Sequence, residues 1–197
     1  MIRTAAMIAT LVAFVPAITL LGCGEESASS QGLSARDIPV AHTPAGGYGD
    51  EFPPPILTGC TEPLVEGAPD LRGLWVTVAV EVDGAPAPDD HPAWNHFERI
   101  EQCGDRLVVT AGGVIHDMRC DGTVENGVHD VAADFRTPIV VVATYEDGVH
   151  TLRPMGVPVV VSRRLDGDEM IWTYLTFTAR LRRIGPPDTE PPRKEPS

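Results

Sequence analysis

The stretch Leu71-Arg-Gly-Leu-Trp-Val-Thr-Val-Ala-Val-Glu-Val82 decides the fold class of this chain. Valine occupies every second position from Val76 to Val82, and this alternation is typical of a β-strand. Further apolar runs follow, and turns rich in glycine and aspartate separate them, which favours hairpins. We expect these runs to form strands at 97–102, 106–110, 114–119, 139–145, 149–153, 157–164 and 170–177, the last continuing toward residue 184.

No part of the sequence has the pattern of a long amphipathic helix. About eight short strands joined by short loops predict an all-β fold, an antiparallel up-and-down β-barrel, with a β-sandwich as the alternative. If Trp75 faces the interior of a barrel, regular alternation turns the four valines of 76–82 outward. A solvated barrel should alternate, so we expect residues 50–70, a second sheet or a partner to cover part of the outer surface.

The first 22 residues have the pattern of an export signal. Arg3 is the only charged residue before Glu25, and an apolar run from Ala5 to Leu21 follows it. This run is interrupted by Pro16 and is short for a membrane-spanning helix, which needs about 20 apolar residues. A positive start, a short apolar core and a small residue before the cut indicate a secretory signal peptide.

Leu20-Leu21-Gly22-Cys23 resembles the lipobox of bacterial lipoproteins. The resemblance implies cleavage before Cys23 and attachment of lipid, including palmitate-type acyl chains, to that cysteine. Two or more acyl chains anchor a protein stably to a membrane. Gly24 stands where an inner-membrane retention signal usually has aspartate, so the resemblance favours the outer membrane. We therefore expect a lipid-anchored protein of the cell envelope.

The remaining 175 residues are sufficient for one domain with a core. We expect residues 23–59 to be a flexible tether rich in Pro, Gly and Ser, 60–186 to be the β-barrel domain, and 187–197 to be a disordered tail. The formal net charge is −13, and removing Arg3 with the signal peptide makes it −14. Such an acidic chain repels phosphate backbones, which argues against nucleic-acid binding.

Three cysteines remain after lipidation of Cys23. Outside the cytoplasm two of them are expected to form a disulfide. Cys103 and Cys120 would lie about two strand spacings apart, roughly 9–10 Å, which is beyond disulfide reach. We therefore predict Cys60–Cys103, with Cys60–Cys120 as the alternative.

Gly73-Leu74-Trp75 resembles the G-x-W motif of lipocalins, which are eight-stranded barrels with an internal ligand cavity. In that family the tryptophan closes one end of the barrel and an arginine of the last strand stacks over it. Arg180, Arg182 and Arg183 are the candidates for this arginine. The resemblance implies a small apolar or amphipathic ligand. The candidate ligand-binding residues are Trp75, Thr77, Ala79, Trp94, Trp172 and Tyr174.

A repeated His-Asp pair, at 116–117 and 129–130, is the richest cluster of polar residues. If the two segments pair antiparallel about Thr123, each histidine faces an aspartate, an arrangement that suits metal binding or general-base chemistry. Two exposed ion pairs are the alternative interpretation. Motifs of nucleotide-binding, zinc-protease and serine-hydrolase sites are absent. We therefore predict no catalytic residues, no metal and no cofactor.

Two functions remain open from the sequence. The first is a lipocalin-like lipoprotein that holds a small apolar or amphipathic ligand. The second is a structural or protein-interaction lipoprotein of the outer membrane that binds another envelope protein, and its sign would be a contiguous exposed apolar patch. An enzyme centred on the His-Asp segments is a weaker third hypothesis.

Overall fold

The computed structural model describes residues 32–192. The predicted signal peptide, Cys23 and the last five residues of the predicted tail lie outside the described residues. The described residues contain strands, turns and extended segments but no helix. Accordingly, no helix in this part of the chain is long and apolar enough to cross a membrane.

Eleven strands form one antiparallel sheet. Their bounds are β1 (Gly73–Val82), β2 (Ala85–Pro86), β3 (Phe97–Cys103), β4 (Arg106–Ala111), β5 (Val114–Arg119), β6 (Val128–Val131), β7 (Pro138–Glu146), β8 (Val149–Pro154), β9 (Val161–Asp166), β10 (Glu169–Tyr174) and β11 (Phe177–Gly185).

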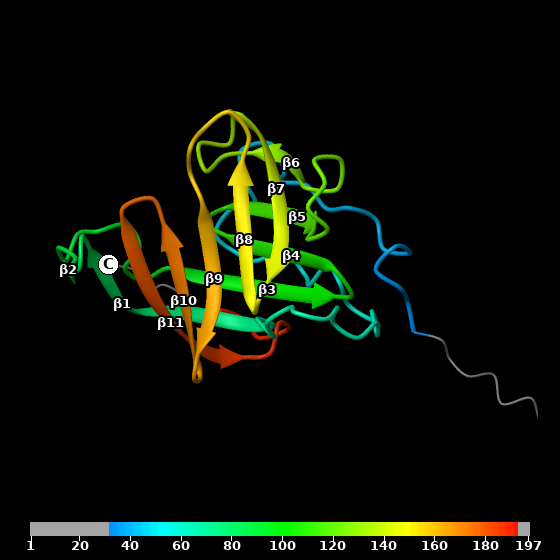
Figure 1. Cartoon of the computed structure of the whole chain (residues 1–197), viewed down its shortest axis with the longest axis horizontal. Helices are drawn as coiled ribbons and strands as arrows, with labels where there is room; N and C mark the ends of the chain where they lie inside the picture. The colour runs from blue at the N-terminus through cyan, green and yellow to red at the C-terminus, as the bar shows by residue number, and fades with distance from the viewer. Residues whose placement is uncertain (1–31, 193–197) are drawn as a thin grey trace, which may run out of the picture. The chain divides into compact units, whose positions relative to one another are not determined.

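The strands follow one another in an up-and-down meander that curls into a nearly closed barrel. The hydrogen-bonded order is β5-β4-β3-β1-β11-β10-β9-β8-β7-β6, and β2 pairs only with β1. Figure 1 shows β7, β8 and β9 crossing in front of β3 and β4. The predicted all-β antiparallel barrel is thereby confirmed. Its path has more strands than expected because a turn at Leu175 (φ 51°) divides the last run and because residues 128–131 add β6.

The first long strand does not alternate regularly, and this corrects the outward orientation expected for all four valines. The register of β1 against β11 shifts between Thr77 and Ala79, which is a β-bulge. A bulge adds one residue and reverses the face of the residues that follow. Consequently Val80, only 2% exposed, joins the interior core that also contains Trp75.

The outer face of β3, β4 and β5 is covered by residues 33–60, which we name the N-terminal strap. Ala35 and Leu57 of the strap pack with Val108 and Ile115 of the barrel in a second core. The sparse apolar residues of this segment predict a flexible tether. In the structure these few apolar residues lie over apolar side chains of the outer face, so the strap forms an ordered layer from Leu33 onward.

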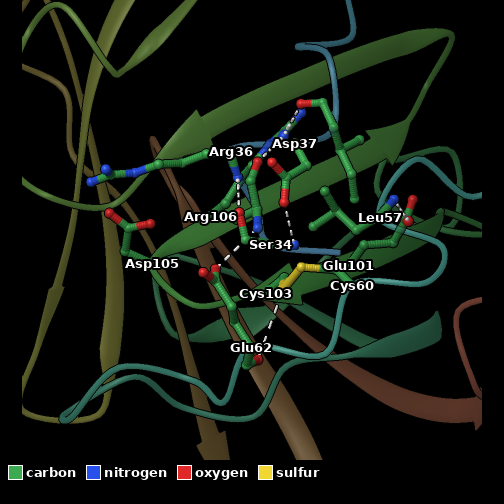
Figure 2. The surroundings of a disulfide bond; sticks show 12 residues. Ser34, Arg36, Asp37, Leu57, Cys60, Glu62, Glu101, Cys103, Asp105 and Arg106 are labelled. Atoms are coloured by element: carbon green, nitrogen blue, oxygen red, sulfur yellow. Dashed lines mark hydrogen bonds between the residues drawn. A yellow bond between two sulfur atoms is a disulfide. The ribbon is translucent and has the colours of Figure 1, made fainter. Parts of the chain in front are cut away.

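A disulfide joins the strap to the end of β3. Cys60 and Cys103 are bonded with a Cα–Cα distance of 6.2 Å, the first of the two predicted pairings. Figure 2 shows Glu62 and Glu101 on either side of this bond. Glu62 accepts a hydrogen bond from the Ala35 amide (3.0 Å), and Glu101 accepts one from the Leu57 amide (2.7 Å). Cys120 is free and buried, and burial raises the pKa of its thiol to about 12.

Candidate functional site

An ion pair crosses the interior of the barrel. Arg163 of β9 donates from Nε and Nη2 to the two carboxylate oxygens of Glu98 on β3, both at 2.9 Å. Both residues are almost fully buried. Burial opposes ionisation of Glu98, but Arg163 and His96 outweigh it and lower the pKa of this carboxyl to about 2. The interior therefore holds a fixed positive and a fixed negative charge.

Trp172 of β10 contacts both this ion pair and His96 of the β2–β3 loop. The guanidinium of Arg163 lies 5.6 Å from the centroid of the indole ring. The ring of His96 stacks on the same indole at 4.8 Å, and His96 Nε2 lies 3.7 Å from a Glu98 oxygen. The aromatic and charged groups thus form one continuous cluster.

His150 of β8 completes the cluster beside Arg163, its cross-strand neighbour. The side chain is fully buried, and burial together with the charge of Arg163 lowers its pKa to about 3. The imidazole is therefore neutral at physiological pH, with one N–H donor and one acceptor. Neither ring nitrogen has a hydrogen-bond partner.

Several polar atoms of this cluster lack partners although they are buried. We name their side chains, together with Glu98 and His96, the interior polar cluster. Buried polar groups in proteins are nearly always hydrogen-bonded, to protein, to water or to a ligand. Most of the unpartnered atoms here are donors, so they match a molecule that carries hydrogen-bond acceptors. The atoms are Arg163 Nη1, His150 Nδ1 and Nε2, Trp172 Nε1, Thr77 Oγ1 and His96 Nε2.

Aromatic rings gather where β10 turns into β11, at the end of the barrel that we call the mouth. Phe177 lies 5.0 Å from Trp172, 5.7 Å from Tyr174 and 5.0 Å from His91 of the β2–β3 loop, measured between ring centroids. Trp94 of the same loop packs against the core and donates from Nε1 to the Pro88 carbonyl (2.8 Å). These rings cover the mouth.

Trp75 closes the opposite end. Its side chain is 1% exposed and donates from Nε1 to the Leu71 carbonyl at 2.7 Å. Arg183 of β11 lies over its ring. The expected contact between an arginine of the last strand and this tryptophan is therefore present, and Arg183 is the residue that provides it.

The six predicted ligand-binding residues take different places. Thr77 and Trp172 belong to the interior polar cluster, Trp75 lies at the closed end, and Trp94 and Tyr174 lie at the mouth. Ala79 follows the bulge and is half-buried opposite the exposed Arg180, so it lies outside the interior core.

Sequence reasoning missed Glu98, Arg163 and His150. Each is a polar residue inside a strand. Arg163 carries the clearest signal in the sequence, because it follows the apolar run 157–161. A single charged residue in a strand does not reveal which face it occupies. The partner of Arg163, Glu98, is 65 residues away along the chain.

The two His-Asp segments do not pair as expected, which corrects that interpretation. His116 bonds through Nε2 to the Val131 carbonyl (3.0 Å), and His129 bonds to the Val124 carbonyl (2.7 Å). Asp117 instead faces outward and binds Arg106 beneath the strap. The segments do not form a hairpin, because their strands β5 and β6 are the two ends of the hydrogen-bonded path and are connected by the 120–127 loop.

Comparison with known proteins identifies no family for this chain. No protein-family model matches the sequence, and no curated protein matches it either. Among solved structures, the chain is similar to human cRBP IV with a TM-score of 0.42 and 12% sequence identity. The alignment covers 58% of this chain and 98% of that one.

Proposed function

We propose that this chain is a lipid-anchored envelope protein whose barrel binds a small amphipathic ligand. The observation that carries the proposal is the interior polar cluster, whose buried donors lack partners. A ligand with a carboxylate or carbonyl end can accept hydrogen bonds from Arg163, His150 and Trp172. Its apolar part would pack against the aliphatic core and the aromatic rings of the mouth.

The unpartnered donors favour a ligand that places a polar end inside the barrel over a ligand that is wholly apolar. Leaving a buried donor without a partner costs about 1–3 kcal/mol, and a bound acceptor removes this cost. The Glu98 carboxylate already takes up two donors of Arg163, and Arg163 Nη1 is left for the ligand. We therefore expect a ligand with one acceptor-bearing end, such as a fatty-acid-like molecule.

The anchor at Cys23 remains a proposal that rests on the lipobox resemblance. Incorporation of radiolabelled palmitate into the parent chain and into a Cys23→Ser variant tests this anchor. The label and the membrane association should both be lost in the variant. Equal membrane association of parent and variant would contradict anchoring through this cysteine.

The ligand proposal is tested with the Cys23→Ser full chain, which avoids detergent. Native mass spectra are compared with denaturing ones, and a mass lost on denaturation indicates a retained small molecule. The delipidated protein is then titrated with dansyl-undecanoic acid, a fluorescent amphipathic carboxylate. A saturable, one-to-one increase in fluorescence is expected, and its absence would contradict the proposal.

A matched pair of substitutions locates the binding site. Thr77→Val and Trp172→Phe each remove one unpartnered polar group from the interior polar cluster. Each should weaken binding about three- to tenfold, as expected for the loss of one hydrogen bond. Thr110→Val is the control, because Thr110 is also buried with an unpartnered hydroxyl but pairs with Arg99 on the outer face. Equal effects of Thr77→Val and Thr110→Val would place binding elsewhere.

A second candidate function is binding of another envelope protein. The loop between β8 and β9 exposes Met155 (56%), Val157 (52%) and Val160 (53%), a cluster of apolar side chains that a partner could cover. Serine substitutions at these three positions would abolish capture of a protein partner from crosslinked envelopes while leaving the dansyl-undecanoic acid titration unchanged. No crosslinked partner in the parent would remove this candidate.

A further inference from the structure

The barrel has a seam between β5 and β6, the two ends of its hydrogen-bonded path. No ladder joins these strands. The Arg119 amide donates to the Asn126 carbonyl at 2.7 Å, and His116 bonds to the Val131 carbonyl, each link lying at one end of the seam. Elsewhere along the path, neighbouring strands are joined by ladders of backbone pairing, one of which contains the bulge in β1. The seam is therefore the part of the wall that separates most easily.

A cavity of about 460 Å³ lies at this seam. One wall is formed by the strap, including Ile38 and His42, and the other by Asn126 and His129. Met118 of β5 also lines the cavity, although its side chain is 2% exposed and belongs to the interior core. The cavity thus lies between the strap and the outside of the seam, next to a strand whose Met118 side chain belongs to the interior core.

Part of the strap crosses the seam and bonds to both of its strands. The Ala41 amide donates to Asp117 on β5 (2.8 Å), and the Thr43 amide donates to Asp130 on β6 (2.9 Å). The Thr43 hydroxyl also accepts a hydrogen bond from the Ile115 amide on β5 at 2.9 Å. These bonds hold the strap across a wall that the strands themselves do not close.

This crossing segment has fixed points on either side. Before it, Arg106 donates to the carbonyls of Ala35, Ile38 and Pro39 at 2.7–2.8 Å. After it, the Tyr48 amide donates to the Gly113 carbonyl at 3.0 Å. Residues 40–47 lie between these fixed points, and we name them the gate. Gly46, with φ 81° and open space around its Cα, gives the gate a position that can change conformation at low cost.

The two ends of the barrel are less suitable as entrances. Aromatic rings cover the mouth, and the Trp75 side chain, with Arg183 over it, closes the other end. A ligand that enters at either end must displace packed rings. Entry at the seam requires only that the gate moves and that a small number of hydrogen bonds break.

We propose that the β5–β6 seam is a lateral entrance through which the amphipathic ligand reaches the barrel interior, and that residues 40–47 gate it. This inference rests on the proposed function, since it concerns the path of that ligand. The gate contacts the seam and lies outside the interior polar cluster. It therefore controls the rates of entry and exit, whereas the cluster sets the affinity.

Stopped-flow kinetics with dansyl-undecanoic acid and the Cys23→Ser full chain test the entrance. Thr43→Val removes the hydroxyl that bonds Ile115 and keeps the side-chain shape. It is expected to raise the association and dissociation rates together by about three- to tenfold, with an unchanged dissociation constant. Thr58→Val makes the same substitution elsewhere in the strap, where the hydroxyl bonds only the Pro55 carbonyl. This control should leave both rates unchanged.

A second variant acts in the opposite direction. His129→Trp places a large side chain in the cavity and should slow both rates at an unchanged dissociation constant. Val40→Trp, at another exposed position that lines the cavity, serves the same purpose if the first variant unfolds. Trp94→Ala at the mouth is expected to leave the association rate unchanged, because the ligand does not enter there, and any lost packing against the ligand should appear only as faster dissociation.

The outcomes separate the entrance from the proposed function. An association rate that rises in Trp94→Ala but does not respond to the seam variants would overturn the lateral entrance while leaving ligand binding intact. A seam variant that changes only one of the two rates, and so changes the dissociation constant, would also overturn it. Absence of saturable binding by the parent chain would overturn both proposals.

Discussion

The guanidinium carbon of Arg183 lies 4.7 Å from the centroid of the Trp75 ring. The two residues are cross-strand partners where the first and last long strands meet. Arg183 also donates from Nη2 to the Asp70 carbonyl at 2.7 Å, so it ties the segment before β1 to the end of β11. The closed end of the barrel is thus stabilised by one side chain that makes two kinds of contact.

Arg183→Met is expected to lower the free energy of unfolding by about 1–2 kcal/mol, because it removes the cation–π contact and one hydrogen bond. Urea unfolding followed by tryptophan fluorescence measures the change. Arg182→Met is the control, since Arg182 is exposed like Arg183 but lies opposite Val76 rather than Trp75. Equal losses in the two variants would show that the contact with Trp75 contributes nothing specific.

The buried pair of Arg106 and Asp117 makes a second prediction. Asp117→Ala leaves Arg106 buried without its counter-charge and removes the acceptor of the Ala41 amide. Loss of one partner of a buried pair costs about 3–5 kcal/mol, which chemical unfolding would detect. The exposed Asp70–Arg72 pair supplies the comparison, and Arg72→Met should cost less than about 1 kcal/mol. A small effect of Asp117→Ala would mean that water reaches Arg106.

The disulfide makes a third prediction. Cys60 and Cys103 are 43 residues apart, and cross-linking a loop of this length stabilises the folded state by about 4 kcal/mol in the chain-entropy treatment. Replacing both cysteines with alanine should lower the urea midpoint accordingly. A reductant should lower the midpoint of the parent by a similar amount and leave the variant unchanged. If reductant has no effect on the parent, the bond does not contribute to stability.

The lowered pKa of His150 makes the stability of the folded chain depend on pH. The pKa of His150 is lowered by burial to about 3, against 6.5 when it is exposed. Below pH 6.5 the unfolded chain therefore binds a proton that the folded chain does not, and stability falls as the pH falls toward 3. When the pH is lowered from 7 to 5, this proton uptake by the unfolded chain lowers the free energy of unfolding of the parent by about 2 kcal/mol.

His150→Phe should remove this part of the pH dependence. The variant is compared with the parent by urea unfolding at both pH values. The buried His116, whose pKa is also lowered by burial, contributes equally to both chains. Substitution of the exposed His129 by Phe is the control and should retain the slope of the parent. The same slope in His150→Phe would contradict a buried neutral imidazole.

The β-strands could be predicted because their signals are local. Alternation and turn residues such as Asp147-Gly148 and Gly167 lie within a few residues of the structures they specify, and strands occur close to the expected ranges. The bulge after Thr77 could not be predicted in this way. It depends on pairing with β11, about a hundred residues later, and it decides which face Val80 occupies.

The candidate site was predicted only in part, because its chemistry depends on long-range contacts. Thr77 and Trp172 could be placed inside from their strands and from the lipocalin resemblance. The charges of Glu98 and Arg163 gave no sign of burial, since each needs the other before burial is tolerable. The strap was missed for a similar reason. Its few apolar residues become significant only against the outer face of β3–β5.

The pairing of β1 with β11 has a consequence for how the chain folds. The barrel wall cannot be completed until the last strand is available, so about a hundred residues must be made before Trp75 meets its partner on β11. Contacts between such distant residues raise the contact order and slow folding. We expect that a chain lacking β11 cannot form the barrel, and that the barrel is completed only after nearly the whole domain has been synthesised.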